Sequence, residues 1–293
     1  MILFIPKDQR SPMQSAPSPF SATEISQYIG RSASSTLRRF DELCGSEVIH
    51  ASFRQRSFAP HSHDTWTIGW VEQGANRFRR GRTEWVAGAN MVCVVNPGEA
   101  HTGGGDAMTY WNLMPSHALL ARVFPETPTD NLFLRDAVIA NAMTVSVVRR
   151  MFASFASTNF TLMQEQAVVE GLVGLFMSGE RIAACDIRKD KVPSAARIAQ
   201  DFIESHLEDT ISLSRLAAET GLSLFHFCRV FESAYGMPPA AYVRNRRVHR
   251  AKQLIEAGSS LADAAATLGF ADQPHMTRQF RAVLGVTPAQ CRA

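Results

Sequence analysis

Three histidines in the first half of the chain are the clearest groups that could do chemistry. His61 and His63 are separated by one residue, and His101 follows at the end of NPGEAH, residues 96–101. Imidazole nitrogens ligate divalent metal ions or hydrogen-bond to polar ligands. The residues alone leave both uses open.

Aromatic and acidic side chains near these histidines favour a pocket for a small molecule. Trp66 and Trp70 follow His63 closely, and Glu99 precedes His101. Small-molecule pockets are lined mainly by apolar and aromatic side chains with a few placed polar groups. The alternative is that the tryptophans fill a core. We expect a small polar effector to contact these residues: His61, His63, Trp66, Trp70, Glu99 and His101.

The C-terminal part of the chain contains one structural unit twice. The segment LSRLAAETGL (213–222) is repeated as LADAAATLGF (261–270), and HFCRVFESAYGMPPA (226–240) is repeated as HMTRQFRAVLGVTPA (275–289). Each copy predicts a short helix, a turn at a glycine and a second helix. This pattern is typical of a helix-turn-helix, whose second helix enters the major groove of DNA.

The outward faces of the second helices carry groups that can recognise bases. Ser223 and Asp272 are predicted to cap these helices, and apolar residues such as Phe231 and Phe280 are predicted to face inward. Arginine and glutamine form bidentate hydrogen bonds with guanine and adenine, and phenylalanine or threonine can contact a thymine methyl. The outward residues with this chemistry, which we expect to read bases, are Phe225, Arg229, Gln273, Thr277 and Arg278.

A basic helix is predicted between the two copies, over residues 239–258. It would hold the two reading helices so that they enter successive major-groove segments about 34 Å apart. Its arginines are expected to contact phosphates, which position a protein without reading sequence. A solvated surface charge is the alternative for each arginine. The expected phosphate contacts are Ser223, Arg244, Arg246, Arg247 and Arg281.

Residues 194–293 resemble the DNA-binding domain of the AraC/XylS family of transcription regulators, most specifically in GFADQPHMTRQFRAVLGVTPAQCR (269–292). By position, the resemblance implies that the residues that read bases are Phe225, Cys228 and Arg229 in the first unit and Gln273, Pro274 and Arg278 in the second. Cys228 and Pro274 stand where the family commonly has polar side chains. Readout is then expected to rest on Arg229, Gln273 and Arg278.

Residues 46–115 predict short strands separated by glycine, asparagine and proline, as in an antiparallel barrel. The segments PHSHDTWTIGWVEQG (60–74) and AGANMVCVVNPGEAH (87–101) resemble the cupin-like sensor domain of many AraC-type proteins. Metal-binding cupins use an HxH pair and a later histidine, but here glycine directly follows proline in PGEAH. Sensor domains of this family often carry such histidines without metal, so we expect no metal and no other cofactor.

Composition narrows the class of protein. With 293 residues and 45% hydrophobic content the chain can bury two cores, and a net charge of +3 excludes a general polycation. Five scattered cysteines without a CxxC motif argue against a disulfide scaffold or a zinc cluster. No apolar run reaches the about 18–20 residues of a membrane span, and MILFIPKDQR does not resemble a signal peptide. We expect a cytoplasmic protein without a membrane partner.

The expected fold class is α+β, with an N-terminal cupin-like antiparallel β-barrel plus helices and a C-terminal all-α double helix-turn-helix domain. The predicted segments are a disordered leader (1–45), an effector-binding and dimerisation domain (46–180), a linker (181–193) and a DNA-binding domain (194–293). Helices predicted within 131–180 would pair two copies into a homodimer, or would merely pack on the barrel.

The resulting hypothesis is an effector-controlled, sequence-specific transcription regulator, not an enzyme. Its expected partners are double-stranded promoter DNA, a small polar effector, RNA polymerase and a second copy of the chain. The family resemblance favours activation over repression. Two alternatives remain: a cupin metalloenzyme fused to a DNA-binding module, and a constitutive DNA-binding protein whose barrel is purely structural.

Overall fold

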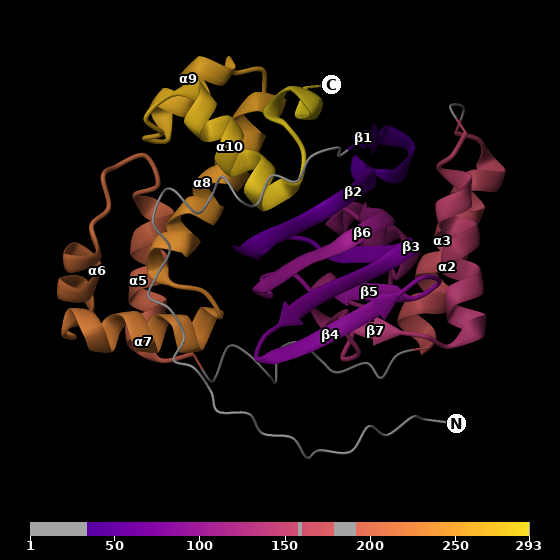
Figure 1. Ribbon diagram of the computed structural model, residues 1–293, viewed down its shortest axis with the longest axis horizontal. Coiled ribbons are helices and arrows are strands. Elements are labelled where there is room, and N and C mark those ends of the chain that lie inside the picture. The colour runs from indigo at the N-terminus through magenta and orange to yellow at the C-terminus, as the bar shows by residue number, and fades with distance from the viewer. Residues whose placement is uncertain (1–33, 158–159, 179–191, 293) are drawn as a thin grey trace.

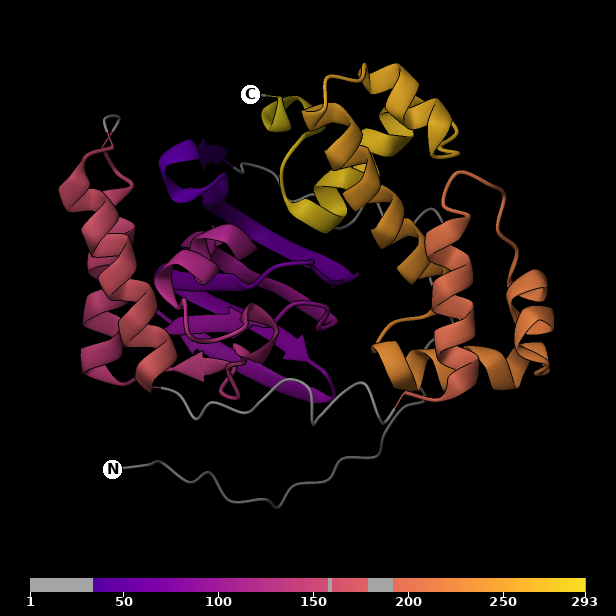
Figure 2. The same cartoon turned by 180° about the vertical axis from the view of Figure 1, so that it is seen from behind.

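The computed structural model describes residues 34–157, 160–178 and 192–292, which form two packed domains (Figure 1). A β-sheet lies in the middle, with α2 and α3 on one side and the C-terminal helices on the other, and the view from behind shows the same layers (Figure 2). The predicted linker (181–193) lies almost wholly outside the described residues.

The N-terminal domain is built on one antiparallel sheet with long central strands. Its pairing order is β1-β2-β6-β3-β5-β7, and β4 pairs with β3. Val48 and Ile68 both lie opposite Leu113, so the alternation of each strand lines one face of the sheet with apolar side chains. The strands are β1 (Ser34–Phe40), β2 (Ser46–His61), β3 (Thr67–Arg80), β4 (Thr83–Gly88), β5 (Val92–Val95), β6 (His101–Met114) and β7 (Val138–Ile139).

The predicted antiparallel, cupin-like architecture is confirmed, with one difference in closure. Among the strands of the described ranges, β1 and β7 stand at the two ends of the pairing order and do not pair with each other. The barrel is therefore open along that side.

Part of the predicted leader is ordered, which corrects the boundary drawn at residue 45. Ser34–Phe40 forms β1 and pairs with β2 along its whole length, and a 3-10 helix follows at Asp41–Leu43. Phe40 and Leu43 are buried in the core under α2 and α3. This apolar burial stabilises a segment that is too short and too polar to show a strand pattern by itself.

Two apolar clusters lie on the two faces of the sheet. One joins Trp66, Ile68 and Leu113 to the helices α1 (His117–Val123), α2 (Ala142–Ser154) and α3 (Leu162–Ser178). The other joins residues of the opposite face to the interior of the C-terminal domain. The two domains thus share one continuous core. A 3-10 helix and the short strand β7 connect α1 to α2, with the 3-10 helix at Thr129–Asn131.

The C-terminal domain contains the two predicted helix-turn-helix units, joined by one long helix. The first unit is α6 (Leu213–Thr220) and α7 (Leu224–Tyr235), and the second is α9 (Leu261–Thr267) and α10 (Gln273–Leu284). The long helix α8 spans Pro239–Glu256. α5 (Ser194–Ser205) precedes the first unit, and a 3-10 helix at Pro288–Cys291 ends the described chain.

The predicted caps of the reading helices are confirmed. The side chains of Ser223 and Asp272 accept the backbone N–H groups of residues three positions on, which satisfies donors that have no partner within the helix. Gly221 has φ 67° at the turn of the first unit, a left-handed conformation that a side chain would strain. Local capping therefore sets where α7 and α10 begin, and so which residues they present outward.

Candidate functional site

The outward faces of α7 and α10 form an exposed surface, here called the reading surface. Arg229, Gln273, Pro274 and Arg278 are exposed, and 73% of Phe225 is accessible to solvent. Cys228 and Thr277 are half-buried at its edge. The guanidinium of Arg229 lies 5.7 Å from the Phe225 ring centroid, which orders this pair. The predicted base-reading residues are thus accessible, and their contacts with bases stay a prediction.

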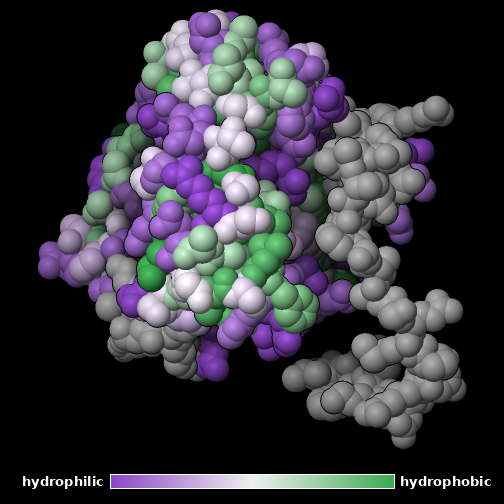
Figure 3. All heavy atoms as spheres, turned by 90° about the vertical axis from the view of Figure 1, so that its left-hand side faces the viewer, coloured by the Kyte–Doolittle hydropathy of each residue, from purple (hydrophilic) through white to green (hydrophobic). Residues whose placement is uncertain are grey.

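Apolar side chains contribute to the reading surface on the side of the first unit. Figure 3 faces this side, and green hydrophobic residues gather over α6 and α7. The large apolar side chains exposed on α5, α6 and α7 are Ile198, Leu213, Leu224 and Phe225. An exposed apolar patch of this kind is typical of an interaction surface.

Two predicted phosphate contacts have protein partners. Arg246 forms ion pairs with Asp64 of the N-terminal domain and Glu204 of α5. Arg247 donates two hydrogen bonds to backbone carbonyls of the segment after α5. Both side chains therefore stabilise the fold in this arrangement, and their contacts with phosphate stay a prediction. Contacts with phosphate remain predictions for Ser223, Arg244 and Arg281.

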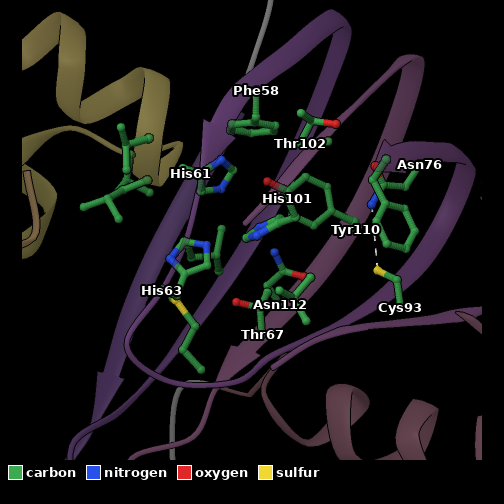
Figure 4. Close-up of a pocket in the computed structure, with 18 of the residues that line it drawn as sticks. Phe58, His61, His63, Thr67, Asn76, Cys93, His101, Thr102, Tyr110 and Asn112 are labelled. Atoms are coloured by element: carbon green, nitrogen blue, oxygen red, sulfur yellow. Dashed lines mark hydrogen bonds between the residues drawn. The ribbon is translucent and has the colours of Figure 1, made fainter. Parts of the chain in front are cut away.

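A cavity of about 90 Å³ lies between the inner face of the sheet and the C-terminal domain. His61, His63 and His101 lie together in its wall and point toward one another (Figure 4). The ring centroids of His61 and His101 are 4.2 Å apart, because the two residues are paired across β2 and β6. The structure thus brings the predicted histidines into one cluster.

The three imidazoles are buried, and burial disfavours their protonation. Burial, and then the neighbouring His101 ring, holds the pKa of His61 well below its usual value, and burial does the same for His63. Burial lowers the pKa of His101 to about 4. Nδ1 of His61 lies 2.7 Å from the carbonyl oxygen of Ala59, and Nδ1 of His101 lies 3.0 Å from that of Glu99. A neutral ring must donate from Nδ1 to a carbonyl, so Nε2 carries the lone pair.

Three other predicted effector contacts lie elsewhere. Trp66 is 1% exposed and packs against Phe176 on the opposite face of the sheet, and Trp70 stacks toward Phe152 of α2. The Glu99 carboxylate pairs with Arg80 and lies outside the cavity wall. The alternation of the strands explains why the tryptophans lie apart from the histidines, because the sequence did not show which face each residue takes. Contact of these three residues with an effector stays a prediction.

Sequence reasoning missed the part of the wall that the C-terminal domain supplies. Lys252 of α8 and Val283, Leu284 and Val286 after and within α10 line the cavity. Tyr110 also lines it, and burial raises the pKa of its hydroxyl to about 12. A tertiary contact between distant segments leaves no local pattern, so the sequence held no signal for these four C-terminal residues.

Polar contacts attach α8 to the end of β2 directly beside the histidine cluster. Asn245 is 1% exposed; its amide donates to the backbone oxygen of Ser62 at 3.2 Å and accepts the Ser62 N–H at 3.3 Å. His249 lies 2.8 Å from the same Ser62 oxygen through Nε2. Lys252 pairs with Glu47 of β2. We call the set Ser62, Asn245, His249, Glu47 and Lys252 the interdomain contact.

Comparison with known proteins agrees with both halves of this architecture. Residues 43–156 match the family described as the AraC-like ligand binding domain, and residues 216–293 match a helix-turn-helix domain family. The HTH-type transcriptional activator AarP of Providencia stuartii is 34% identical over 92 residues, which cover 31% of this chain and 68% of AarP. The chain belongs to the AraC family.

One further relative and one solved structure align over more of the chain. The uncharacterized HTH-type transcriptional regulator YbfI of Bacillus subtilis is 26% identical over 232 residues, 75% of this chain and 82% of YbfI. A solved structure of ToxT from Vibrio cholerae aligns with a TM-score of 0.48 at 10% identity, over 88% of this chain and 97% of ToxT.

Membership in the AraC family settles the class of function. This chain is a DNA-binding transcription regulator controlled by a small-molecule effector, and it is not an enzyme, as the sequence predicted. None of the helices in the described ranges combines the length and hydropathy needed to span a bilayer.

Proposed function

We propose that the cavity between the two domains is the effector site, and that the reading surface of α7 and α10 binds promoter DNA. The observation that carries this proposal is the mixed wall of the cavity. β-strands supply the histidines, and the C-terminal domain supplies Lys252, Val283 and Val286. A molecule held there contacts both domains at once. The lining suits a small molecule with an apolar body and a few hydrogen-bonding groups.

Occupancy of this cavity changes the free energy of the interdomain contact. A ligand shifts a conformational equilibrium only by its differential affinity for the two states. A ligand that contacts both domains binds the packed arrangement more tightly than the separated one, because separation of the domains removes half of its contacts. α8 carries both helix-turn-helix units, so a change at Asn245 or Lys252 alters how the two reading helices are presented.

The experiment compares operator binding by the full chain and by variants of α8. Purified protein is titrated against DNA that flanks its own gene, and against scrambled DNA, at fixed salt. Asn245→Ala leaves the Ser62 N–H without its partner and removes one of the two hydrogen bonds to the Ser62 carbonyl, so we expect operator affinity to change by about 5- to 150-fold, which corresponds to 1–3 kcal/mol. Gln253→Ala is the control, since Gln253 is exposed on the same helix.

Equal affinity of the Asn245→Ala variant and the unaltered chain would contradict the role of the interdomain contact. Equal binding of operator and scrambled DNA by the unaltered chain would contradict sequence-specific reading.

We further propose activation, with RNA polymerase as a partner, because AarP is an activator and is 34% identical. We also propose a cytoplasmic location, because a regulator of this kind must reach promoter DNA.

A homodimer is proposed through α2 and α3, which expose the large apolar side chains of Met143, Leu162, Met163 and Met177. Exposed apolar side chains on an outer helix layer favour burial against a second copy. Sedimentation velocity is expected to show a dimer that Met163→Lys weakens. A monomer at every concentration would contradict it.

A further inference from the structure

We infer that His61, His63 and His101 form a binding site for a divalent transition-metal ion, held through three imidazole nitrogens. The sequence alone argued against this, because PGEAH departs from the usual spacing of such sites. The structure reverses that expectation. His101 begins β6 directly opposite His61 at the end of β2, so strand pairing rather than loop spacing brings the rings together.

The distances fit one ion. One nitrogen from each of the three rings lies within 4.8 Å of the others. A zinc ion with Zn–N bonds of about 2.0–2.1 Å and tetrahedral geometry needs nitrogens about 3.4 Å apart. Small rotations of the His63 ring, whose centroid lies 5.0 Å from that of His61 and 5.2 Å from that of His101, close this difference.

The orientation of two of the rings is fixed as in metal sites. A metal-binding histidine usually donates its second ring N–H to a carbonyl or carboxylate, which sets the tautomer and aims the lone pair at the ion. The Nδ1–H groups of His61 and His101 donate to the carbonyls of Ala59 and Glu99. Their Nε2 lone pairs therefore remain for a ligand. Three neutral acceptors gathered in a cavity favour an electron-pair acceptor between them.

The surrounding charges decide which ion fits. Lys252 lines the same cavity, but its charge is compensated by ion pairs with Glu47 and Glu256. The Glu99 carboxylate forms an ion pair with Arg80. The ligand set is thus neutral nitrogen without a free carboxylate among these groups. Neutral imidazoles suit Zn²⁺, Ni²⁺, Co²⁺ or Cu²⁺, whereas Mg²⁺ and Ca²⁺ require oxygen ligands. Three protein ligands leave a position open for water or for a donor atom of the effector.

The site adjoins the interdomain contact. Ser62, between His61 and His63, is bonded to both Asn245 and His249, and the His63 and His249 rings lie 5.8 Å apart. An ion that fixes His63 would therefore fix the strand end that holds α8. This second step rests on the proposed function, whereas the metal site itself does not.

The test uses tag-free full-length protein, stripped with a chelator and titrated with Co²⁺ and then Zn²⁺. We expect one ion per chain and the visible absorption of nitrogen-coordinated Co²⁺, which Zn²⁺ displaces. His63→Gln and His101→Gln should lose more affinity than the about 10- to 100-fold that removal of an outer-shell partner costs. His50→Gln is the matched control, since His50 lies on β2 with His61 but is stacked on Trp111 outside the cavity wall.

A second measurement guards against misfolded variants. Zn²⁺ should raise the melting temperature of the unaltered chain and of His50→Gln, because an ion that binds only the folded state stabilises it. Zn²⁺ should not raise the melting temperatures of His63→Gln and His101→Gln above their own metal-free values. Absence of ion binding by the unaltered chain, or a Co²⁺ spectrum that both variants retain, overturns the site.

Operator binding with Zn²⁺ and with chelator separates the two steps. A change in affinity that His63→Gln abolishes supports coupling to α8. A bound ion with unchanged operator affinity overturns the coupling and leaves the site standing. A bound ion in a chain that ignores operator sequence overturns the proposed function alone.

Discussion

The two helix-turn-helix units share one backbone plan and differ in what they expose. Both reading helices begin at a side-chain cap and end at a glycine with positive φ, Gly236 and Gly285. α7 exposes Phe225, whereas α10 exposes Gln273 and Arg278. The inner face of the repeat is constrained by folding, and the outer face is free to vary. α7 thus combines the Arg229 guanidinium with an aromatic ring suited to contact a thymine methyl, whereas α10 offers hydrogen bonds to base edges through Gln273 and Arg278.

The two units also differ in how they touch the N-terminal domain. Arg56 of β2 donates to the backbone carbonyls of Arg281 and Gly285 at the end of α10. At α7, the Arg82 side chain reaches Ser233 with a donor–acceptor distance of 3.5 Å. A change in the N-terminal domain therefore reaches α10 through well-formed hydrogen bonds to its backbone, and reaches α7 mainly through α8.

The largest expected effect is a loss of folding stability at the buried positions that the two helix-turn-helix units share. Phe231 and Phe280 are fully buried at matching positions. Phe231→Ala and Phe280→Ala should each lower the free energy of unfolding by about 3–5 kcal/mol, because each leaves a cavity in a packed core. Denaturant titration measures this, with Phe225→Ala as the exposed control. A loss below 1 kcal/mol in one unit only would break the equivalence of the two cores.

A smaller effect, on base discrimination, is expected from a substitution on the outward face of α10. Arg278→Ala should lose about 1–3 kcal/mol of discrimination at a single base pair of the operator, or about 5- to 150-fold, since arginine binds guanine through two hydrogen bonds. Fluorescence anisotropy against a series of base-substituted operators measures this, and Arg54→Ala on the N-terminal domain is the control. Uniform weakening across the series would assign Arg278 to phosphate instead.

Phe225→Ala should weaken operator binding by about 1 kcal/mol, because it removes apolar contact area without removing a hydrogen bond. The loss should vanish on an operator whose contacted thymine is replaced by uracil, which lacks the methyl group. An undiminished loss on the uracil operator would remove the proposed contrast between α7 and α10. Unfolding of this variant should be unchanged, since Phe225 is 73% exposed.

The smallest effect is expected from Arg281→Ala. The side chain is exposed, and only its backbone carbonyl is used by Arg56. Loss of one phosphate contact should weaken all DNA sequences equally and reduce the slope of log affinity against log salt by about 1. Affinities at several salt concentrations test this, and an unchanged slope would show that Arg281 is only a solvated charge.

The C-terminal domain could be predicted in detail because its signals are local. Ser223 and Asp272 cap helices through residues three positions away, and the glycine turn at Gly221 depends on a single backbone angle. Interactions over so few residues can be predicted from the local residue types alone. The repeated pattern then supplied the number of units and the inward phenylalanines.

The candidate pocket could be predicted only in part. The histidines were found by their HxH spacing and the later histidine, which resemble the pattern of metal-binding cupins. Trp66 and Trp70 lie on the other face of the sheet, because a strand has two faces and the sequence did not show which one is turned to the pocket. Arg246 was expected at DNA, but its partner Asp64 lies in the other domain. Pairings between distant segments depend on how whole domains pack, and no local pattern encodes that.

The shared apolar core has a consequence for how this regulator can be rearranged. Val283 and Val286 are buried in the same cluster as Phe53 and Val71 of the sheet. A C-terminal domain expressed alone would show this surface to water and would be prone to aggregate. A chimaera that joins either half to an unrelated partner would meet mismatched surfaces at the same place. A chimaeric regulator built from this chain should therefore take the sheet face and the end of α10 from the same parent protein, because these two surfaces pack against each other.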